Sequence, residues 1–193
     1  MSDPLAPYPV NLATPVFNIG WTQGAPEVRL LSNFAPTPFV LDGVTYGCVE
    51  AFWQSLKYPP NAPARASTAA LTDGFAAKRA GGHRQSKTLE YQDRTYQVGG
   101  AAHHQLFERA LRAKFGQYPE ARACLLATGE ARLTHVLFDG RQQPLPDSVA
   151  LPAAVFCGLL VTIRRELREH TFTAERPLPA SDAARAPTQL GLF

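Results

Sequence analysis

A helix with two distinct faces is predicted over residues 49–58. Apolar side chains recur there at the spacing of one helical face, and polar side chains recur at i, i+4 and i+7. The apolar set is Val49, Phe52, Trp53 and Leu56, and the polar set is Glu50, Gln54 and Lys57. The two faces lie roughly 120° apart, with Trp53 at the border. Such a helix could line a cleft with a carboxylate, an amide, an ammonium group and an aromatic ring.

Further apolar patterns predict three more core elements. Helical periodicity is clear over residues 102–115 and again over residues 155–167. The pair Asp42-Gly43 separates two short apolar, β-branched runs within residues 39–46. This arrangement predicts a β-hairpin with a type I′ turn.

Less regular structure is expected over three other segments. A short strand is expected within residues 15–21, followed by an extended segment over 29–34. Residues 83–100 are polar and turn-prone.

One domain is predicted over residues 15–170, with no internal repeat. Residues 1–14 are rich in proline and small side chains and are expected to form a loose N-terminal arm. Residues 171–193 are rich in alanine and proline, which predicts a disordered C-terminal tail.

The composition is that of a globular protein. Of 193 residues, 45% are hydrophobic and 18% are charged, which excludes a disordered or membrane-spanning chain. A net charge of +3 would tolerate an anionic ligand, but it is not the clustered basicity of a dedicated nucleic-acid binder. No signal peptide or apolar stretch of membrane-spanning length is present.

The cysteine pattern argues against both disulfides and a metal centre. Cys48, Cys124 and Cys157 are far apart and odd in number, and no CxxC or Cys/His zinc spacing occurs. The neighbouring His103 and His104 point apart on a helix, so they do not form a metal site. We therefore expect reduced thiols, a cytoplasmic location, and no metal or other cofactor.

Several short motifs follow one another in a characteristic order. They are Leu30-Leu31-Ser32-Asn33-Phe34, Asp42-Gly43, Val49-Glu50-x-Phe52-x-Gln54-x-x-Lys57, Ala77-Lys78-Arg79, Ala110-Leu111-Arg112-Ala113-Lys114-Phe115 and Leu125-Leu126-Ala127-Thr128-Gly129. Together they resemble the NADAR (YbiA-like) superfamily over residues 18–167. Any one motif would be weak, but the combined order is specific.

The resemblance implies a fold and an activity. The expected fold is α+β and mainly helical, a single compact YbiA-like domain with a small N-terminal β-hairpin region. The expected activity is cleavage of the bond between ribose C1 and a base or amine. The expected partner is a nucleotide-like substrate, either ADP-ribosylated guanine in nucleic acid or a phosphoribosyl pyrimidine. The resemblance assigns Lys57 as the nucleophile and Glu50 as the proton shuttle.

The same resemblance, combined with side-chain chemistry, gives a set of candidate substrate-binding residues. Amides and hydroxyls would hold ribose, aromatic rings would stack on a base, and cations would meet phosphates. The set is Ser32, Asn33, Phe34, Trp53, Gln54, Trp21, Lys78 and Arg79. The same spacing also fits purely structural roles. Glu50 and Lys57 could be a surface ion pair, Asn33 could cap a turn, and Lys78 and Arg79 could be a solvated helix end.

Some aromatic positions of the superfamily are absent. The region that carries a Trp about sixteen residues before Phe115 in the superfamily reads Tyr96-Gln97-Val98-Gly99-Gly100, and Tyr96 is the candidate replacement. A later Trp-Gly motif is replaced by the segment around Phe138. These changes leave a second hypothesis open, a non-catalytic NAD or ADP-ribose binding module. A third is a nucleic-acid-associated factor.

Overall fold

The computed structural model describes residues 14–22, 24–82, 84 and 86–180. The N-terminal arm other than residue 14, and residues 181–193 of the tail, lie outside them. The elements in chain order are β1 (Val16–Asn18), the 3-10 helix η1 (Pro26–Leu31), β2 (Phe39–Leu41), β3 (Val44–Tyr46), α1 (Val49–Ser55), α2 (Pro63–Ala69), α3 (Gly74–Gly81), β4 (Thr88–Tyr91), β5 (Arg94–Gln97), α4 (Ala101–Gln117), α5 (Pro119–Ala127), β6 (Arg132–Thr134) and α6 (Ala153–Arg168).

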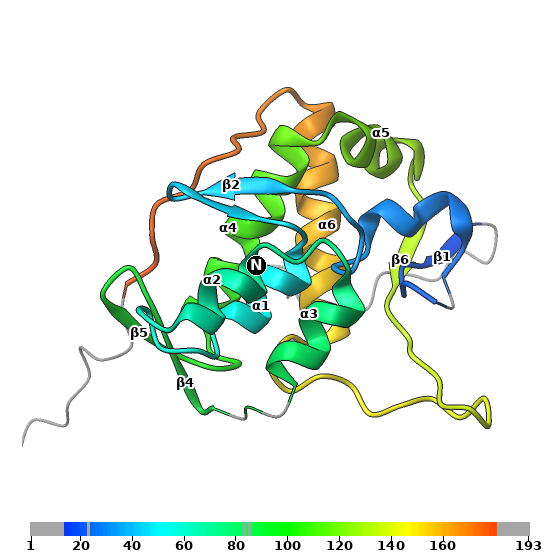
Figure 1. Ribbon diagram of the computed structural model, residues 1–193. Helices are drawn as coiled ribbons and strands as arrows, with labels where there is room; N and C mark the ends of the chain where they lie inside the picture. Colours follow the sequence, from blue (N-terminus) through cyan, green and yellow to red (C-terminus); the bar gives the residue numbers. More distant parts are fainter. Residues whose placement is uncertain (1–13, 23, 83, 85, 181–193) are drawn as a thin grey trace, which may run out of the picture.

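The helices form the body of the molecule, and the described strands pair as three small two-stranded sheets. Figure 1 shows α4 and α6 together at the centre, with the β2–β3 hairpin across α4 and α1 packed between α2 and α3. The core draws apolar side chains from all of these layers, among them Phe52, Leu106, Phe115 and Leu160. The predicted α+β, mainly helical fold of one compact domain is confirmed.

The Asp42-Gly43 hairpin forms as predicted. Asp42 and Gly43 both have positive φ, 48° and 79°, as a type I′ turn requires. The Asp42 carboxylate accepts two hydrogen bonds from the Arg109 guanidinium of α4, at 2.7 and 2.8 Å. The Tyr91 hydroxyl donates a third, at 2.7 Å. The hairpin is therefore tied by its turn to α4 and β4.

The extended conformation expected over residues 29–34 is wrong in its first half, because residues 29–31 lie in η1. This helix begins with proline at its first turn, a position that tolerates the missing N–H. The turn-prone segment 83–100 contains a regular element that was not predicted, the β4–β5 hairpin, in which Leu89 and Tyr96 pair and are both buried. Its turn residues Gln92 and Asp93 have φ of 50° and 56°, so a type I′-like turn forms without glycine.

The described part of the predicted tail, residues 171–180, lies along the domain as an extended strap. It has no helix or strand, and its backbone carbonyls accept hydrogen bonds from side chains of α4 and β5. Arg109 donates to Arg176 O at 2.8 Å, Arg112 to Thr173 O at 3.1 Å, and Arg94 to Pro179 O at 2.8 Å. In Figure 1 the strap runs from the end of α6 toward β5.

Within the described residues, no helix is both long enough and apolar enough to cross a membrane.

The Asp42–Arg109 contact gives a stability prediction. The Arg109 guanidinium holds the pKa of Asp42 below its ordinary value of 3.8, so the contact stabilises the fold above that pH and is lost as pH falls through the folded-state pKa. We expect Asp42→Asn to lower the free energy of unfolding by about 2–3 kcal/mol at pH 7, because a charge-assisted pair is lost. In urea unfolding, the difference from the wild type should narrow below pH 3.8.

Asp93→Asn is the matched control. Asp93 is exposed in the β4–β5 turn, and asparagine tolerates its positive φ. We expect a change within about 0.5 kcal/mol. An equal decrease in the free energy of unfolding for Asp42→Asn and Asp93→Asn would contradict a specific role for the Asp42–Arg109 pair.

Candidate functional site

The polar face of the helix predicted over residues 49–58 is present, but α1 ends at Ser55. Lys57 therefore lies in the turn that follows the helix, with its backbone N–H donating to Gln54 O at 3.3 Å. Glu50 and Gln54 are one turn apart within α1, and the Gln54 amide donates to Glu50 Oε1 at 2.7 Å. The carboxylate, the amide and the amine thus lie on consecutive turns.

Glu50 is a buried carboxyl group, only 8% exposed. Burial raises its pKa, against the lowering effects of the Gln54 hydrogen bond and of the nearby cations Lys78 and Lys57. Its backbone N–H donates to Asn33 O at 2.9 Å, which ties the first turn of α1 to the preceding loop. A carboxyl group in this setting retains a proton at higher pH than a solvated one, as a proton donor requires.

Lys57 is partly buried beside Trp53 and the end of α3. Its Nζ lies 3.4 Å from Gly81 O and 5.7 Å from the centre of the Trp53 ring. Burial lowers the pKa of Lys57; Glu50 raises it and Lys78 lowers it further. A lowered pKa increases the fraction of neutral amine, the form that acts as a nucleophile.

Gln54 is the buried hydrogen-bond partner of Glu50. It is 3% exposed, and a Cβ atom added to Gly81 would come within 2.3 Å of its Oε1. Only glycine at the end of α3 leaves room for this side chain. In this conformation Gln54 orients the Glu50 carboxyl group and is covered by α3.

The loop Ser32–Asn33–Phe34 lies against α1 and α3. Ser32 is buried, and its Oγ accepts a hydrogen bond from Phe34 N at 3.3 Å. The buried Asn33 Oδ1 has no hydrogen-bond partner among the described residues. The Phe34 ring contacts Phe75 edge-on at 5.1 Å, and Lys78 Nζ lies 5.6 Å from its centre. The loop thus presents an amide oxygen and an aromatic ring near the cations of the site.

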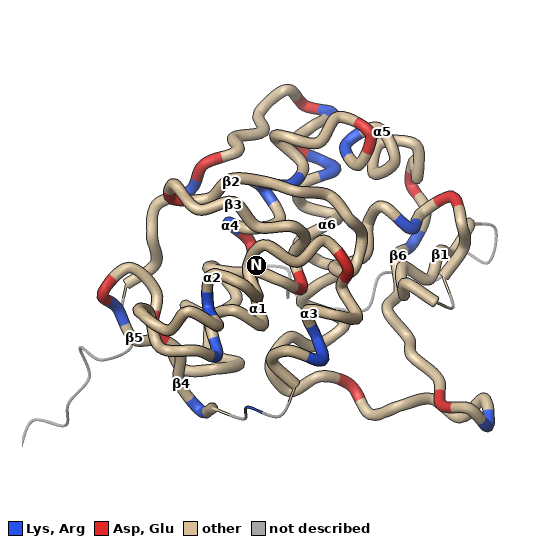
Figure 2. The backbone as a smooth tube through the Cα atoms, viewed as in Figure 1, with Lys and Arg blue, Asp and Glu red and all other residues tan. Residues whose placement is uncertain are grey.

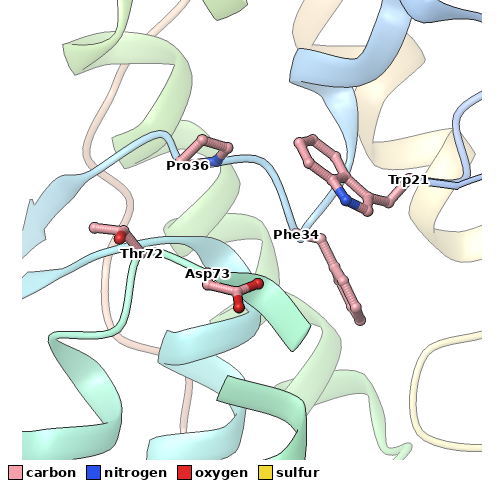
Figure 3. A pocket seen from close by; sticks show the side chains of 5 residues that line it. All are labelled: Trp21, Phe34, Pro36, Thr72 and Asp73. Carbon is pink, nitrogen blue, oxygen red and sulfur yellow. The ribbon is translucent and has the colours of Figure 1, made fainter. Parts of the chain in front are cut away.

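An open pocket of about 240 Å³ lies beside Phe34, which forms part of its lining. Its lining residues are Trp21, Phe34, Pro36, Thr72 and Asp73. Figure 3 shows the two aromatic side chains on one side of this pocket and Thr72 and Asp73 on the other. Trp21 therefore joins Phe34 in one aromatic hollow, whereas Trp53 packs beside Lys57.

Arg79 differs from the other candidates. Its side chain is 73% exposed, and it lies 3.9 Å from the Asp73 carboxylate, whose own side chain is 60% exposed. Lys78 and Arg79 are successive residues of α3, and Lys78 is the one that lies over Phe34. Basic and acidic residues are interspersed along the chain in Figure 2, without a long basic stripe.

Tyr96, the candidate replacement for the superfamily tryptophan, is fully buried in the core, and its hydroxyl donates to Pro179 O of the strap at 3.2 Å. The ring that lies against Trp53 is that of His103, with 4.6 Å between ring centres. His103 Nδ1 accepts a hydrogen bond from Gly99 N at 3.2 Å, which fixes the ring on α4.

Sequence reasoning missed the positions that support this site. Gly81 ends α3, and its close approach to Gln54 depends on a contact between α1 and α3. Thr72 and Asp73 precede α3, and Asp73 accepts a hydrogen bond from Phe75 N at 2.9 Å. Their place in the pocket depends on tertiary packing, so no local pattern could reveal it. Within the part of the chain that the structure describes, no group of three or more His, Cys, Asp or Glu could hold a metal ion.

Comparison with protein-family models matches residues 26–165 to the family described as Bacteriophage protein GP30.3. The match extends from η1 into α6 and includes the loop, α1 and α3. The chain belongs to the GP30.3 family. Two curated proteins similar to this GP30.3-family chain are the N-glycosidase YbiA of Escherichia coli (strain K12) and that of Shigella boydii serotype 4 (strain Sb227).

Both curated proteins are 35% identical to the GP30.3-family chain over 102 residues, which are 53% of this chain and 59% of each relative. The matched region thus spans less than two thirds of the relatives' length. The NMR structure of the E. coli protein YbiA is 28% identical, with a TM-score of 0.53 over 73% of this chain and 79% of that chain. The resemblance is confirmed: the chain is a divergent YbiA-like member.

The close packing at Gly81 gives a second prediction. We expect Gly81→Ala to lower the free energy of unfolding by about 1–3 kcal/mol, because the new methyl group overlaps the Gln54 side chain. Displacing Gln54 removes a hydrogen bond that lowers the pKa of Glu50. Carbon-13 NMR titration of the Glu50 carboxyl group should therefore show a still higher pKa.

Gly158→Ala is the matched control. A Cβ there meets nothing within 4 Å, and Gly158 lies on the exposed side of α6. We expect this variant to gain about 0.5–1 kcal/mol, since alanine favours a helix over glycine. A gain at Gly81 as well would show that Gln54 has room to move.

Proposed function

We propose that this protein is an N-glycosidase that cleaves the bond between ribose C1 and a base or amine. The observation that carries the proposal is the desolvated Glu50–Lys57 pair, in which burial raises the pKa of the carboxyl group and lowers that of the amine. The similarity to curated N-glycosidases supports this reaction class. The substrate class is ADP-ribose linked to guanine in nucleic acid, an ADP-ribose conjugate, or a phosphoribosyl pyrimidine.

In the proposed reaction the neutral Lys57 amine attacks C1. The C1–N bond to the base breaks, the base takes the bonding electron pair, and Glu50 supplies its proton. The sugar ring then opens: the C1–O bond breaks, the ring oxygen takes its electron pair and a proton from the attacking nitrogen, and the adduct becomes a protonated Schiff base with Lys57. Water adds to C1, the C1–N bond to Lys57 breaks, and the sugar leaves as its aldehyde. The Lys57 ammonium group so formed returns its extra proton to the Glu50 carboxylate.

The surrounding residues have separate proposed roles. The unpaired Asn33 Oδ1 would accept a hydrogen bond from a ribose hydroxyl. Lys78 would meet a phosphate beside Phe34, and the pocket between Trp21 and Phe34 would take a planar base. Trp53 supports Lys57, and Ser32 and Gln54 hold the loop and the carboxyl group in place. Arg79 lies at the solvated edge, where it would contact an extended nucleic-acid substrate. The three free thiols suit the proposed cytoplasmic location.

One observation favours a second function, a non-catalytic binding module for NAD or ADP-ribose. Tyr96, the candidate replacement for the missing superfamily tryptophan, is in the core. A pocket with fewer aromatic surfaces could hold a nucleotide without aligning its C1 atom for attack. The experiment below distinguishes the two functions.

The direct test is borohydride trapping. Wild-type protein is incubated with an ADP-ribosylated guanosine oligonucleotide, with ADP-ribose, and with a phosphoribosyl pyrimidine, and the protein is then analysed by intact-mass spectrometry. We expect base release and a reduced sugar adduct with one substrate class. Lys57→Met should abolish the adduct and lower kcat by roughly 10³-fold or more, because the nucleophile is removed.

Lys87→Met makes the same chemical change at an exposed lysine before β4. This control should retain both turnover and adduct. Absence of base release in the wild type, together with a rise in Tm when ADP-ribose is added, would contradict catalysis and favour the binding module.

Lys78 gives a prediction about pH dependence. Lys78 lowers the pKa of Glu50 and also that of Lys57, so removing its charge raises both. A reaction that needs a neutral Lys57 and a protonated Glu50 has a bell-shaped pH–rate profile. We expect Lys78→Met to move both limbs of the kcat profile to higher pH, and Lys87→Met to move neither. If kcat falls equally at every pH and neither limb moves, the role of Lys78 is limited to substrate binding.

A further inference from the structure

Lys114 is a fully buried lysine that the proposed reaction does not use. It lies on α4 and is 0% exposed. Its Nζ donates to Ser32 O at 2.9 Å, across 82 residues of sequence, and lies 5.4 Å from the centre of the Phe115 ring. The ammonium group therefore contacts the backbone of the loop that carries Asn33 and Phe34.

The electrostatic setting of Lys114 differs from that of Arg109 and Arg112, the other buried cations of α4. Arg109 is paired with Asp42, and Arg112 with Glu108 and Glu166. None of the ion pairs between described residues includes Lys114. A buried cation without a carboxylate is costly, and an apolar side chain of similar volume is often at least as stable in such a place.

The titratable groups near Lys114 do not remove this cost. Burial lowers the pKa of Lys114 to about 7, and the sulfur atoms of Cys48 on the α1 side and Cys124 on α5 oppose that shift. Burial raises the pKa of both thiols, that of Cys48 to about 11, so both are neutral near pH 7. Stability alone therefore gives a poor account of a lysine at this position.

The loop is held at two successive carbonyl groups. Ser32 O accepts from Lys114 Nζ and also from Ala35 N, at 2.9 and 3.3 Å. Asn33 O accepts from Glu50 N at 2.9 Å. The first contact fixes the loop to α4 and the second fixes it to the start of α1. Between them is the peptide unit that aims the Asn33 side chain, whose Oδ1 is buried without a partner among the described residues.

We propose that Lys114 is a positioning residue for the glycosidase site, which holds the Ser32–Asn33–Phe34 loop so that the Asn33 amide and the Phe34 ring face the substrate. This role rests on the proposed function. Lys114 does not contact the substrate; it acts through the Ser32 carbonyl group. Replacing it with an apolar side chain of similar volume should disturb the geometry of the site and leave the fold intact.

The test compares Lys114→Met with Lys114→Gln. Methionine fills the volume without a donor, and glutamine keeps an N–H donor for Ser32 O one bond closer to the backbone. We expect Lys114→Met to retain or raise Tm while lowering kcat/KM by roughly 10–100-fold, the order seen when groups that orient a reactive side chain are removed. Lys114→Gln should recover part of that loss. A large fall in Tm for both variants would overturn the proposal and make Lys114 a structural residue.

A double-mutant cycle with Asn33→Ala separates positioning from general damage. If Lys114 acts through the loop, Lys114→Met should cost little further activity once the Asn33 amide is absent. If the losses of activity in Lys114→Met and Asn33→Ala add fully in the double variant, the proposal is contradicted.

A measurement without substrate keeps this test independent of the proposed function. In nitrogen-15 NMR spectra of Lys114→Met, the Asn33 side-chain amide and the Phe34 backbone signal should shift or broaden, and the Gly43 signal in the distant hairpin should not. Arg164→Met is the control, because Arg164 is a buried cation that donates to Thr128 and Ala131; it should leave the Asn33 signal unchanged. Unperturbed loop signals in Lys114→Met would overturn the proposal. If the wild type shows no turnover but the loop signals are perturbed in Lys114→Met, the proposed glycosidase activity is refuted, whereas the role of Lys114 in holding the loop is supported.

Discussion

Desolvation of the polar face of α1 is the constraint on which the candidate site depends. In water, Glu50 would be an anion and Lys57 a cation. In these forms the carboxylate does not donate a proton and the ammonium group is not a nucleophile. Packing α3 and the Ser32–Phe34 loop against this face moves the two pKa values toward each other. The same packing puts the Gln54 amide on the carboxyl group and leaves the amine beside Trp53. Burial thus favours a protonated carboxyl group and a neutral amine on one face of α1.

The site is assembled from segments that are distant in sequence and held by backbone contacts. Asn33 O binds the N–H of Glu50, Gly81 O lies beside Lys57, and Ser32 O binds Lys114. Carbonyl groups of one loop and one helix end thus set the distances between the functional side chains. A small shift of α3 or α4 would alter the site without altering any residue in it. Gly81 carries no reactive group, yet it leaves the space that the Gln54 side chain occupies.

The sequence predicted the elements whose signals are local. Periodicity gave the helices around Leu106 and Leu160, and Asp42-Gly43 gave the first hairpin with its turn. The β4–β5 hairpin was missed because Gln92 and Asp93 adopt positive φ without glycine, a weak signal within a polar segment. The parallel pairing of β1 with β6 joins strands more than a hundred residues apart, which no local pattern encodes. The motif carrying Glu50 and Lys57 was visible, but the burial that changes their pKa values depends on α3, and the environment of Lys114 depends on η1 and α5.

The strap over residues 171–180 shows how a segment with the composition of a disordered tail can be held in one path. The hydrogen bonds that α4 and β5 donate to it end on backbone carbonyl groups, and the donors are arginine and tyrosine side chains of the domain. Proline lacks an N–H but keeps its carbonyl oxygen, so a proline-rich strap loses none of these acceptors. Side chains add to this hold at a few positions, since Arg176 pairs with Glu166 and Phe172 lies under the Arg112 guanidinium. Away from those positions the path of the strap is set by main-chain oxygens, which a change of side chain does not remove.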